Sequence, residues 1–349
     1  MKTHFDFIIV GQGLAGTLLA HYLNKNGKSV LLIDQFNNSS SSNIAAGIIH
    51  PITGRRLVKS WMFDIAYPVA RAAYSEMELK FNQTLFQKSA ILEIYSSIKN
   101  RNDWIALTAD ETMKNLIDRE LTANEIRGVD MPYGGMILKA TGYLNIKKML
   151  ANYRNYFQEN KSLICEEFLF SDLKIMDYAV DYKGIIASKI IFCEGFHAVQ
   201  NPYFKTLPYQ FAKGEILILE CPGLSEEYII NKSIYIQPLS NSRFRMGATY
   251  EWNQLDDVPT ETAREKLIEQ FKLVVSLPFK IVEHYAAVRP TVKGRRPLIG
   301  LHSKYNQVGI FNGLGTKGVL LAPYFAKHFT EHLLFEKPLL KEVEIDFYL

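Results

Sequence analysis

The chain has 349 residues, 48% of them hydrophobic and 22% charged, which is enough for about two globular domains with apolar cores. The formal net charge of +4 permits an anionic partner such as RNA without indicating one, and no run of roughly 20 apolar residues predicts a membrane span. The three cysteines, Cys165, Cys193 and Cys221, are widely spaced, so they predict neither a disulfide framework nor a metal site and favour a reducing, cytoplasmic location.

The N-terminal segment predicts a dinucleotide-binding unit. Its elements are an apolar strand at residues 7–10, a turn with Gly11, Gly13 and Gly16 in G-x-G-x-x-G spacing, a helix at 17–24, a strand at 30–33, and Asp34. The first glycine permits a tight turn, the second a close approach of backbone to pyrophosphate, and the third close packing of helix on strand. The acid follows the last glycine at nearly the spacing of a ribose-binding carboxylate. The alternative is a purely structural glycine turn.

The middle of the chain alternates strand and helix signals. A serine-rich run at 37–43 predicts a loop. Helical spacing of apolar residues appears at 61–81 and 144–156, and strands are predicted at 91–95, 163–165 and 184–192. Residues 108–116 and 122–126 predict short helices or turns, with capping-box character at Thr122.

From residue 211 onward, strand-like runs are separated by turn residues. We predict strands at 214–219, 233–237, 243–250 and 285–288, a helix at 260–277, a strand at 308–311, a glycine turn at 312–318, and a helix at 319–334. The sequence therefore predicts an α/β fold. Its Rossmann-like domain (1–80, 141–205 and 290–349) is interleaved with an α+β substrate domain (81–140 and 206–289) built on an antiparallel sheet.

Three positions in the C-terminal half are candidates for chemistry. Arg289 ends an apolar strand immediately before Pro290, which suits either bidentate binding of a carboxylate or a structural ion pair. Tyr235 alternates with two isoleucines, so it lines a pocket or lies in the core. The turn containing Lys317 is either an anion cradle or an ordinary helix start. His50 and His197 have no partners at metal-ligand spacing, so no metal is predicted.

Taken in order, these motifs resemble the FAD-dependent D-amino-acid oxidase superfamily, which includes glycine oxidase and sarcosine oxidase. The resemblance runs over nearly the whole chain and is carried by residues 6–16, 42–49, 187–195, 213–217, 235–238, 246–249, 288–290, 296–300, 313–318 and 322–323. It implies an FAD-dependent enzyme that oxidises the C–N bond of a small amino acid or N-substituted glycine. Hydride would pass to flavin N5 without a dedicated protein base, and the imine would hydrolyse.

The resemblance also implies roles for individual residues. Arg289 would bind the substrate carboxylate, Tyr235 would assist it, and Lys317 would face the flavin. The implied FAD-binding residues are Gly11, Gly13, Leu14, Ala15, Gly16, Asp34, Gln35, Ser42, Ala46, Gly47, Ile48, Phe168, Gly195, Gly313, Leu314, Gly315, Thr316 and Lys317. Because residues 289–300 contain no counterpart of the covalent-flavin cysteine of some sarcosine oxidases, noncovalent FAD is expected.

Two alternatives remain open at this point. Residues 43–51 and 313–323 are similar to the oxidase domain of the bifunctional enzyme that modifies wobble uridine in tRNA, which removes a carboxymethyl group from a secondary amine. This chain lacks the methyltransferase half, and Lys317 stands where arginine is usual in that domain, so a tRNA partner is possible but not favoured. A non-catalytic flavin sensor is the other alternative, and Arg289 argues against it.

Overall fold

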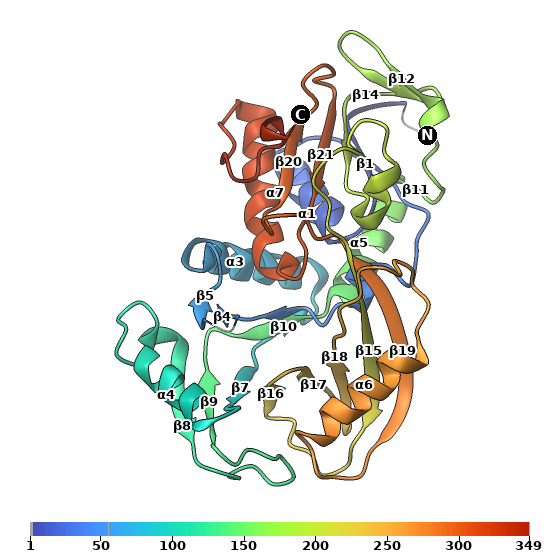
Figure 1. The fold of residues 1–349 in the computed structure, drawn as a ribbon. Coiled ribbons are helices and arrows are strands. Elements are labelled where there is room, and N and C mark those ends of the chain that lie inside the picture. Colours follow the sequence, from blue (N-terminus) through green and yellow to red (C-terminus); the bar gives the residue numbers. More distant parts are fainter. Residues whose placement is uncertain (1–2, 55, 349) are drawn as a thin grey trace.

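In the computed structural model, which describes residues 3–54 and 56–348, two eight-stranded sheets organise the fold (Figure 1). The first sheet contains β1 (His4–Val10), β2 (Val30–Ile33), β11 (Leu163–Ile164), β12 (Leu173–Ile175), β13 (Val180–Tyr182), β14 (Ile185–Phe192), β20 (Leu298–Leu301) and β21 (Val308–Asn312). Strands β11, β2, β1, β14 and β21 run parallel in that spatial order. Their carboxyl ends meet at one edge, where an open α/β sheet binds ligands.

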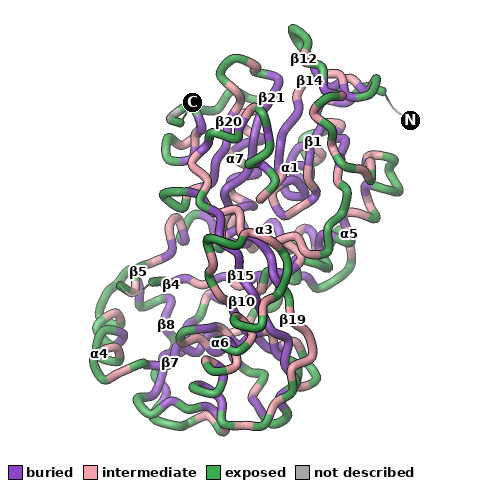
Figure 2. The backbone as a smooth tube through the Cα atoms, turned by 45° about the vertical axis from the view of Figure 1, so that its right-hand side comes forward, coloured by how far each residue is buried: buried purple, intermediate pink, exposed green. Residues whose placement is uncertain are grey.

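Helices cover one face of this sheet, and its other face packs into a second apolar core that includes residues of β12 and β13. The helices are α1 (Leu14–Lys25), α3 (Phe63–Phe81), α5 (Ile146–Glu159) and α7 (Gly318–Phe335). Phe7 and Ile9 of β1 pack into the helical core, whereas Ile8 and Val10 pack into the core beneath β12 and β13. Because β1 is covered on both faces, its residues 7–10 form a continuous apolar run, and β1 is buried in Figure 2.

The second sheet has the order β19-β15-β18-β17-β16-β7-β9-β8. Its strands are β7 (Ala90–Ile94), β8 (Ile117–Leu121), β9 (Gly135–Leu138), β15 (Ala212–Glu220), β16 (Tyr228–Asn231), β17 (Tyr235–Ser240), β18 (Arg243–Gly247) and β19 (Lys280–Arg289). Helix α6 (Glu261–Lys272) contributes Leu267 and Phe271 to the core on one face. All neighbouring strands are antiparallel except β7 and β16, so the sheet is mixed rather than purely antiparallel.

The remaining elements are short. They are α2 (Ser41–Ile44), β3 (Ile48–Ile49), β4 (Ile52–Thr53), β5 (Val58–Lys59), β6 (Phe86–Gln87), α4 (Ile98–Leu107) and β10 (Gly142–Leu144), with 3₁₀ turns η1 (Lys114–Leu116), η2 (Phe170–Asp172), η3 (Gly195–Gln200) and η4 (Ile345–Phe347). Strand β10 lies between β3 and β6 in a small antiparallel sheet.

Several local predictions need correction. The serine run predicted as a loop contains the one-turn helix α2, whose backbone N–H groups at Asn43 and Ile44 donate to the Ser40 carbonyl oxygen. Ser42 in this turn accepts a hydrogen bond on its Oγ from the Leu14 N–H at 3.1 Å. Helix α4 was missed, although Ser97 caps it by accepting a hydrogen bond from the Asn100 N–H. At 122–126 the prediction of a short helix or turn is confirmed as a turn, in which the Glu125 carboxylate accepts from the Thr122 N–H and hydroxyl.

Candidate active site

A cavity of about 1100 Å³ lies between the two sheets. One wall comes from the carboxyl end of β1, the start of α1, residues 33–48, and the segments that follow β14 and β21. The facing wall comes from β15, β17, β18 and β19 of the second sheet. Residues nearly 300 positions apart in sequence therefore meet around one space.

Two glycines of the turn after β1 have no room for a side chain. Gly11 has φ +99°, and a Cβ there would lie 2.5 Å from the carbonyl oxygen of Cys193. A Cβ on Gly16 would collide with the carbonyl oxygen of Gly11. The turn consequently lets α1 begin directly against the cavity, where a helix N-terminus favours an anion.

Asp34 lies in the cavity wall with three partners. Its Oδ2 accepts the Gln12 N–H at 2.8 Å, and its Oδ1 accepts the Phe36 N–H at 2.8 Å and Arg154 Nη1 at 3.1 Å. Oδ2 of Asp34 can therefore accept one further hydrogen bond. Arg154 also donates to the Gln12 side chain at 2.7 Å and lines the cavity. Sequence reasoning missed Arg154, because it comes from α5, 120 residues from Asp34.

The turn after β21 contributes Leu314, Gly315 and Thr316 to the wall. Gly313 and Lys317 are absent from that wall, as is Gly16. Lys317 Nζ donates to the Thr53 hydroxyl at 3.1 Å, and burial, followed by repulsion from Arg296 and Arg295, lowers its pKa. The structure thus places Lys317 behind the turn, toward the β4–β5 hairpin, rather than in the cavity.

Arg289 is the cation of the second wall. Its two terminal nitrogens donate to the Thr249 carbonyl oxygen at 3.1 and 3.2 Å, Nη1 also lies 3.3 Å from the Lys213 carbonyl oxygen, and its guanidinium lies 4.3 Å from the centre of the Tyr250 ring. Among residues 3–54 and 56–348, no carboxylate forms an ion pair with it. Burial lowers the pKa of Arg289, yet a guanidinium stays charged in proteins.

Tyr235 belongs to the same wall. Ile234 and Ile236 point into the core beneath the sheet, and Tyr235 points toward the cavity, as the alternating pattern predicts. Its hydroxyl lies 3.3 Å from the place that a Cβ on Gly247 would occupy. Burial raises the pKa of Tyr235, so the hydroxyl is a neutral donor.

Two further acids near the cavity escaped sequence reasoning. Glu194 lines the cavity beside Gly11 and accepts the Asn201 amide at 2.7 Å; burial raises the pKa of Glu194 to about 7. Glu93 is buried and accepts from His50 Nε2 at 2.5 Å and from the Asn231 amide at 2.7 Å. His50 was left unassigned because its partner is 43 residues away.

Most of the predicted site residues share this cavity. Those in its wall are Gly11, Gly13, Leu14, Ala15, Asp34, Gln35, Ser42, Ala46, Gly47, Ile48, Phe168, Gly195, Tyr235, Arg289, Leu314, Gly315 and Thr316.

In the described part of the chain, no helix has the length and apolar character needed to cross a bilayer. The same residues hold no group of three or more His, Cys, Asp or Glu side chains placed to bind a metal ion.

Two sequence relatives have established names. The chain is 22% identical to the glycine oxidase of Bacillus subtilis over 348 residues, covering 93% of this chain and 91% of the relative. It is also 22% identical to the tRNA 5-methylaminomethyl-2-thiouridine biosynthesis bifunctional protein MnmC of Legionella pneumophila over 320 residues, covering 84% of this chain. The chain spans only 45% of that bifunctional relative's length.

The fold of the chain is also similar to that of solved oxidase structures. The iminodiacetate oxidase of Chelativorans superposes with a TM-score of 0.80 and 20% identity over 98% of both chains. The family model described as FAD dependent oxidoreductase matches residues 6–332, nearly the whole chain. This protein therefore belongs to the FAD-dependent oxidoreductase family and is an oxidoreductase enzyme.

Proposed function

We propose that this enzyme oxidises the C–N bond of a small amino acid or an N-substituted glycine. The observation that carries the proposal is Arg289, a cation in the cavity wall that contacts only carbonyl oxygens and an aromatic ring among the described residues. A partly buried guanidinium without a counter-ion favours binding of a carboxylate, which it can hold through two parallel hydrogen bonds. A redox sensor would not need such a group.

The cavity also suits FAD. Gly11 and Gly16 leave no space for a Cβ because backbone atoms of the protein lie against them, which fixes the turn. Gly13 lines the cavity without a side chain, so a pyrophosphate can approach the backbone there, and the N-terminus of α1 opens onto the same space. We propose that this turn holds the pyrophosphate, that Asp34 binds the adenosine ribose, and that Gly315 and Thr316 lie against the flavin. When bound, FAD supplies the acceptor for the hydride that leaves the substrate carbon.

The protein's own contribution is positioning. Arg289 would fix the carboxylate, and the neutral hydroxyl of Tyr235 would donate to the carboxylate or accept from the amine. Ile48, Ile216 and Ala248 supply apolar wall that excludes water from the reacting atoms. Since the glycine oxidase and iminodiacetate oxidase resemble this chain over nearly their full lengths, a substrate with an amino-acetate unit is the class we favour.

The decisive experiment is spectroscopic. The purified protein should show a flavin spectrum, and anaerobic addition of glycine, sarcosine, iminodiacetate or a D-amino acid should bleach it. Absence of flavin in protein refolded or expressed with excess FAD would overturn the proposal. Release of the flavin into the supernatant after acid precipitation would show that it is noncovalent, as we propose. We also propose a cytoplasmic location, which the wide spacing of the three cysteines favours and which cell fractionation would test.

The second candidate is a tRNA-modifying oxidoreductase that removes the carboxymethyl group from a carboxymethylaminomethyl uridine. Its support is the bifunctional relative, which covers 84% of this chain. A flavin that is untouched by free amino acids, together with tRNA binding that weakens steeply with salt, would favour this candidate over the first.

We also propose that the chain has two interleaved domains, one of residues 1–80, 141–205 and 290–349 and one of residues 81–140 and 206–289. The support for this division is that β7–β9, from residues 81–140, complete the same sheet as β15–β19, from residues 206–289.

A further inference from the structure

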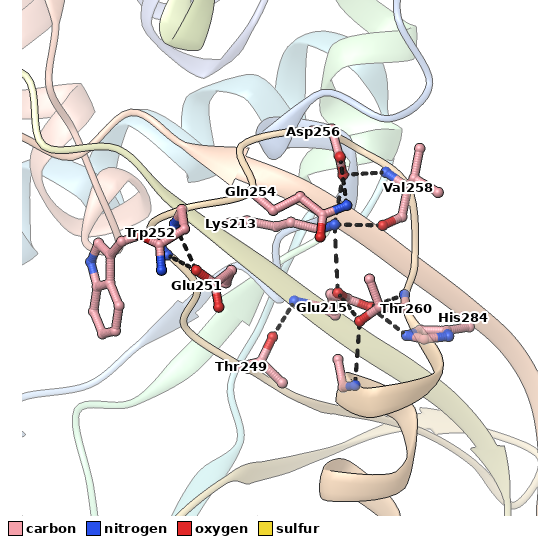
Figure 3. Close-up of polar contacts among 12 residues, drawn as sticks. Lys213, Glu215, Thr249, Glu251, Trp252, Gln254, Asp256, Val258, Thr260 and His284 are labelled. Atoms are coloured by element: carbon pink, nitrogen blue, oxygen red, sulfur yellow. Dashed lines mark hydrogen bonds and ion pairs between the residues drawn. The ribbon is translucent and has the colours of Figure 1, made fainter.

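The segment 249–260 follows β18, and a buried lysine side chain of β15 binds it. Lys213 is only 1% exposed, and its Nζ lies 2.6 Å from Asp256 Oδ1, 2.6 Å from the Val258 carbonyl oxygen and 3.7 Å from Glu215 Oε1 (Figure 3). An ammonium removed from water needs a counter-charge and hydrogen-bond acceptors, and this segment supplies most of them. Lys213 therefore holds the segment at its middle.

Glu215 holds the same segment at both ends. Its carboxylate, 2% exposed, accepts the Thr260 N–H at 2.8 Å and the Thr260 hydroxyl at 2.9 Å. Its backbone N–H donates to the Thr249 hydroxyl at 2.9 Å, and His284 Nε2 lies 2.9 Å from Oε2 on the far side (Figure 3). Lys213 and Glu215 are two residues apart, so both side chains leave the same face of β15.

Gly214, between them, belongs to the opposite face, which carries Arg289. The segment that Lys213 holds also supplies the groups that orient Arg289: the Thr249 carbonyl oxygen and the Tyr250 ring. The main chain couples the two faces further, because the Lys213 N–H donates to the Glu251 carbonyl at 2.8 Å, and the Lys213 carbonyl accepts from the Glu251 N–H at 3.0 Å and from Arg289.

We propose that the Lys213–Asp256 ion pair positions Arg289 for carboxylate binding by holding the segment 249–260 in place. This inference rests on the proposed function of Arg289. Asp256 lines the same cavity as Arg289, whereas Lys213 does not. In the proposed role both act through the segment and not on the substrate, so both are positioning residues, and Lys213→Met tests the role without changing a cavity residue.

If the Asp256 charge is removed, the nearest remaining carboxylate for Lys213 is Glu215, 3.7 Å away, and an ammonium drawn toward it leaves Asp256 and Val258. The segment then loses this tether, and Thr249 and Tyr250 are left supported beside Arg289 by the hydrogen bonds of Thr249 and Glu251 to β15.

The first test is Asp256→Asn in the FAD-loaded enzyme. The Asp256 side chain is 39% exposed, so the variant is expected to fold. Loss of a charge-assisted hydrogen bond is expected to raise the Kd for glycine or sarcosine in anaerobic flavin reduction about tenfold or more. The limiting rate constant at saturating substrate should change less than the Kd, because Arg289 itself remains. Lys213→Met should have the same effect, and the double variant should be no worse than the single ones.

Glu120→Gln is the matched control. It breaks the Arg101–Glu120 ion pair, with a 2.7 Å contact, on β8 at the other edge of the same sheet. This control should leave the Kd at the wild-type value. A wild-type Kd in Asp256→Asn, with a raised Kd in Arg289→Ala, would overturn the positioning role and leave the proposed function standing. A wild-type Kd in Arg289→Ala would instead overturn the proposed function.

A second readout does not depend on the substrate. Trp252 lies in the held segment, 57% exposed and stacked on Tyr250 at 6.0 Å. Release of the segment should increase quenching of tryptophan fluorescence by iodide in Asp256→Asn and Lys213→Met, but not in Glu120→Gln. Unchanged quenching in Asp256→Asn would overturn the proposal, whatever amine the enzyme oxidises.

Discussion

Gly214 lies directly beneath the guanidinium of Arg289. A Cβ at position 214 would overlap Nη1, Nη2 and Cζ of the arginine, which are the far end of a flexible side chain. The backbone of Gly214 is not left-handed, so the glycine is required by this contact rather than by its own φ. The missing side chain of Gly214 on β15 thus leaves a space that the Arg289 guanidinium fills.

Gly214→Ala should therefore displace Arg289 without disturbing the cofactor. We expect the Kd for the amino-acid substrate to rise by about ten- to a hundredfold, since part of the charge-assisted binding of a carboxylate is lost. Stopped-flow reduction measures the Kd, and the visible spectrum gives the FAD content. A Kd equal to that of the wild type would show that Arg289 reaches its binding position even with a methyl beneath it.

Arg289→Ala should abolish this binding almost entirely. Loss of two charge-assisted hydrogen bonds predicts a fall in kcat/KM of about 10²- to 10³-fold. Arg289→Lys should recover only part of it, because an ammonium lacks the planar fork of the guanidinium. Both variants should keep FAD. Loss of FAD from Arg289→Ala would place the arginine at the cofactor rather than at the substrate.

Gly11→Ala should remove FAD, and Gly27→Ala serves as its matched control. Both glycines have positive φ, +99° and +73°, so both substitutions strain the backbone. Only at Gly11 does a Cβ also meet backbone, at 2.5 Å from Cys193; at Gly27 it meets open space. Purified Gly11→Ala should contain little flavin, whereas Gly27→Ala should contain the wild-type amount with a lower Tm. Full FAD occupancy in Gly11→Ala would contradict the assignment of this turn to the pyrophosphate.

Glu194 should make the cofactor-free protein less stable as the pH rises. Burial raises its pKa from 4.5 to about 7, so the folded state binds the proton more tightly than the unfolded state does. The stabilising contribution is complete below about pH 4.5 and is lost between there and about pH 7, by up to about 3 kcal/mol. Urea unfolding of wild type and Glu194→Gln at pH 5 and pH 8 measures the difference.

The glutamine variant should be less sensitive to pH over this interval. His21 titrates in the opposite sense: burial lowers its pKa to about 4, so its contribution is lost as the pH falls from 6.5 toward 4. Because His21 is present in both proteins, the difference between them isolates Glu194. Identical pH slopes would show that Glu194 is solvated in the folded state.

The nucleotide-binding half was readable from sequence because its signals are local. The apolar run of β1 and the glycine spacing before α1 are set by residues close to each other in the sequence. The family followed from the order of such segments along the chain, and the match over residues 6–332 confirmed it. Helix boundaries were less accurate: α6 ends at Lys272, whereas its apolar spacing predicted a helix to residue 277.

The sequence by itself determined that this chain folds as a dinucleotide-binding α/β protein of the FAD-dependent family, because those properties depend on neighbours in sequence. Only the tertiary structure decided what surrounds Arg289, why Lys317 faces Thr53, and that Arg154 meets Asp34. Lys213 and Asp256 are 43 residues apart, and no spacing rule links them; the ion pair exists because β15 and the segment after β18 meet in space. Which charged side chains pair depends on which strands and loops become neighbours in the fold, and local sequence patterns do not specify those neighbours.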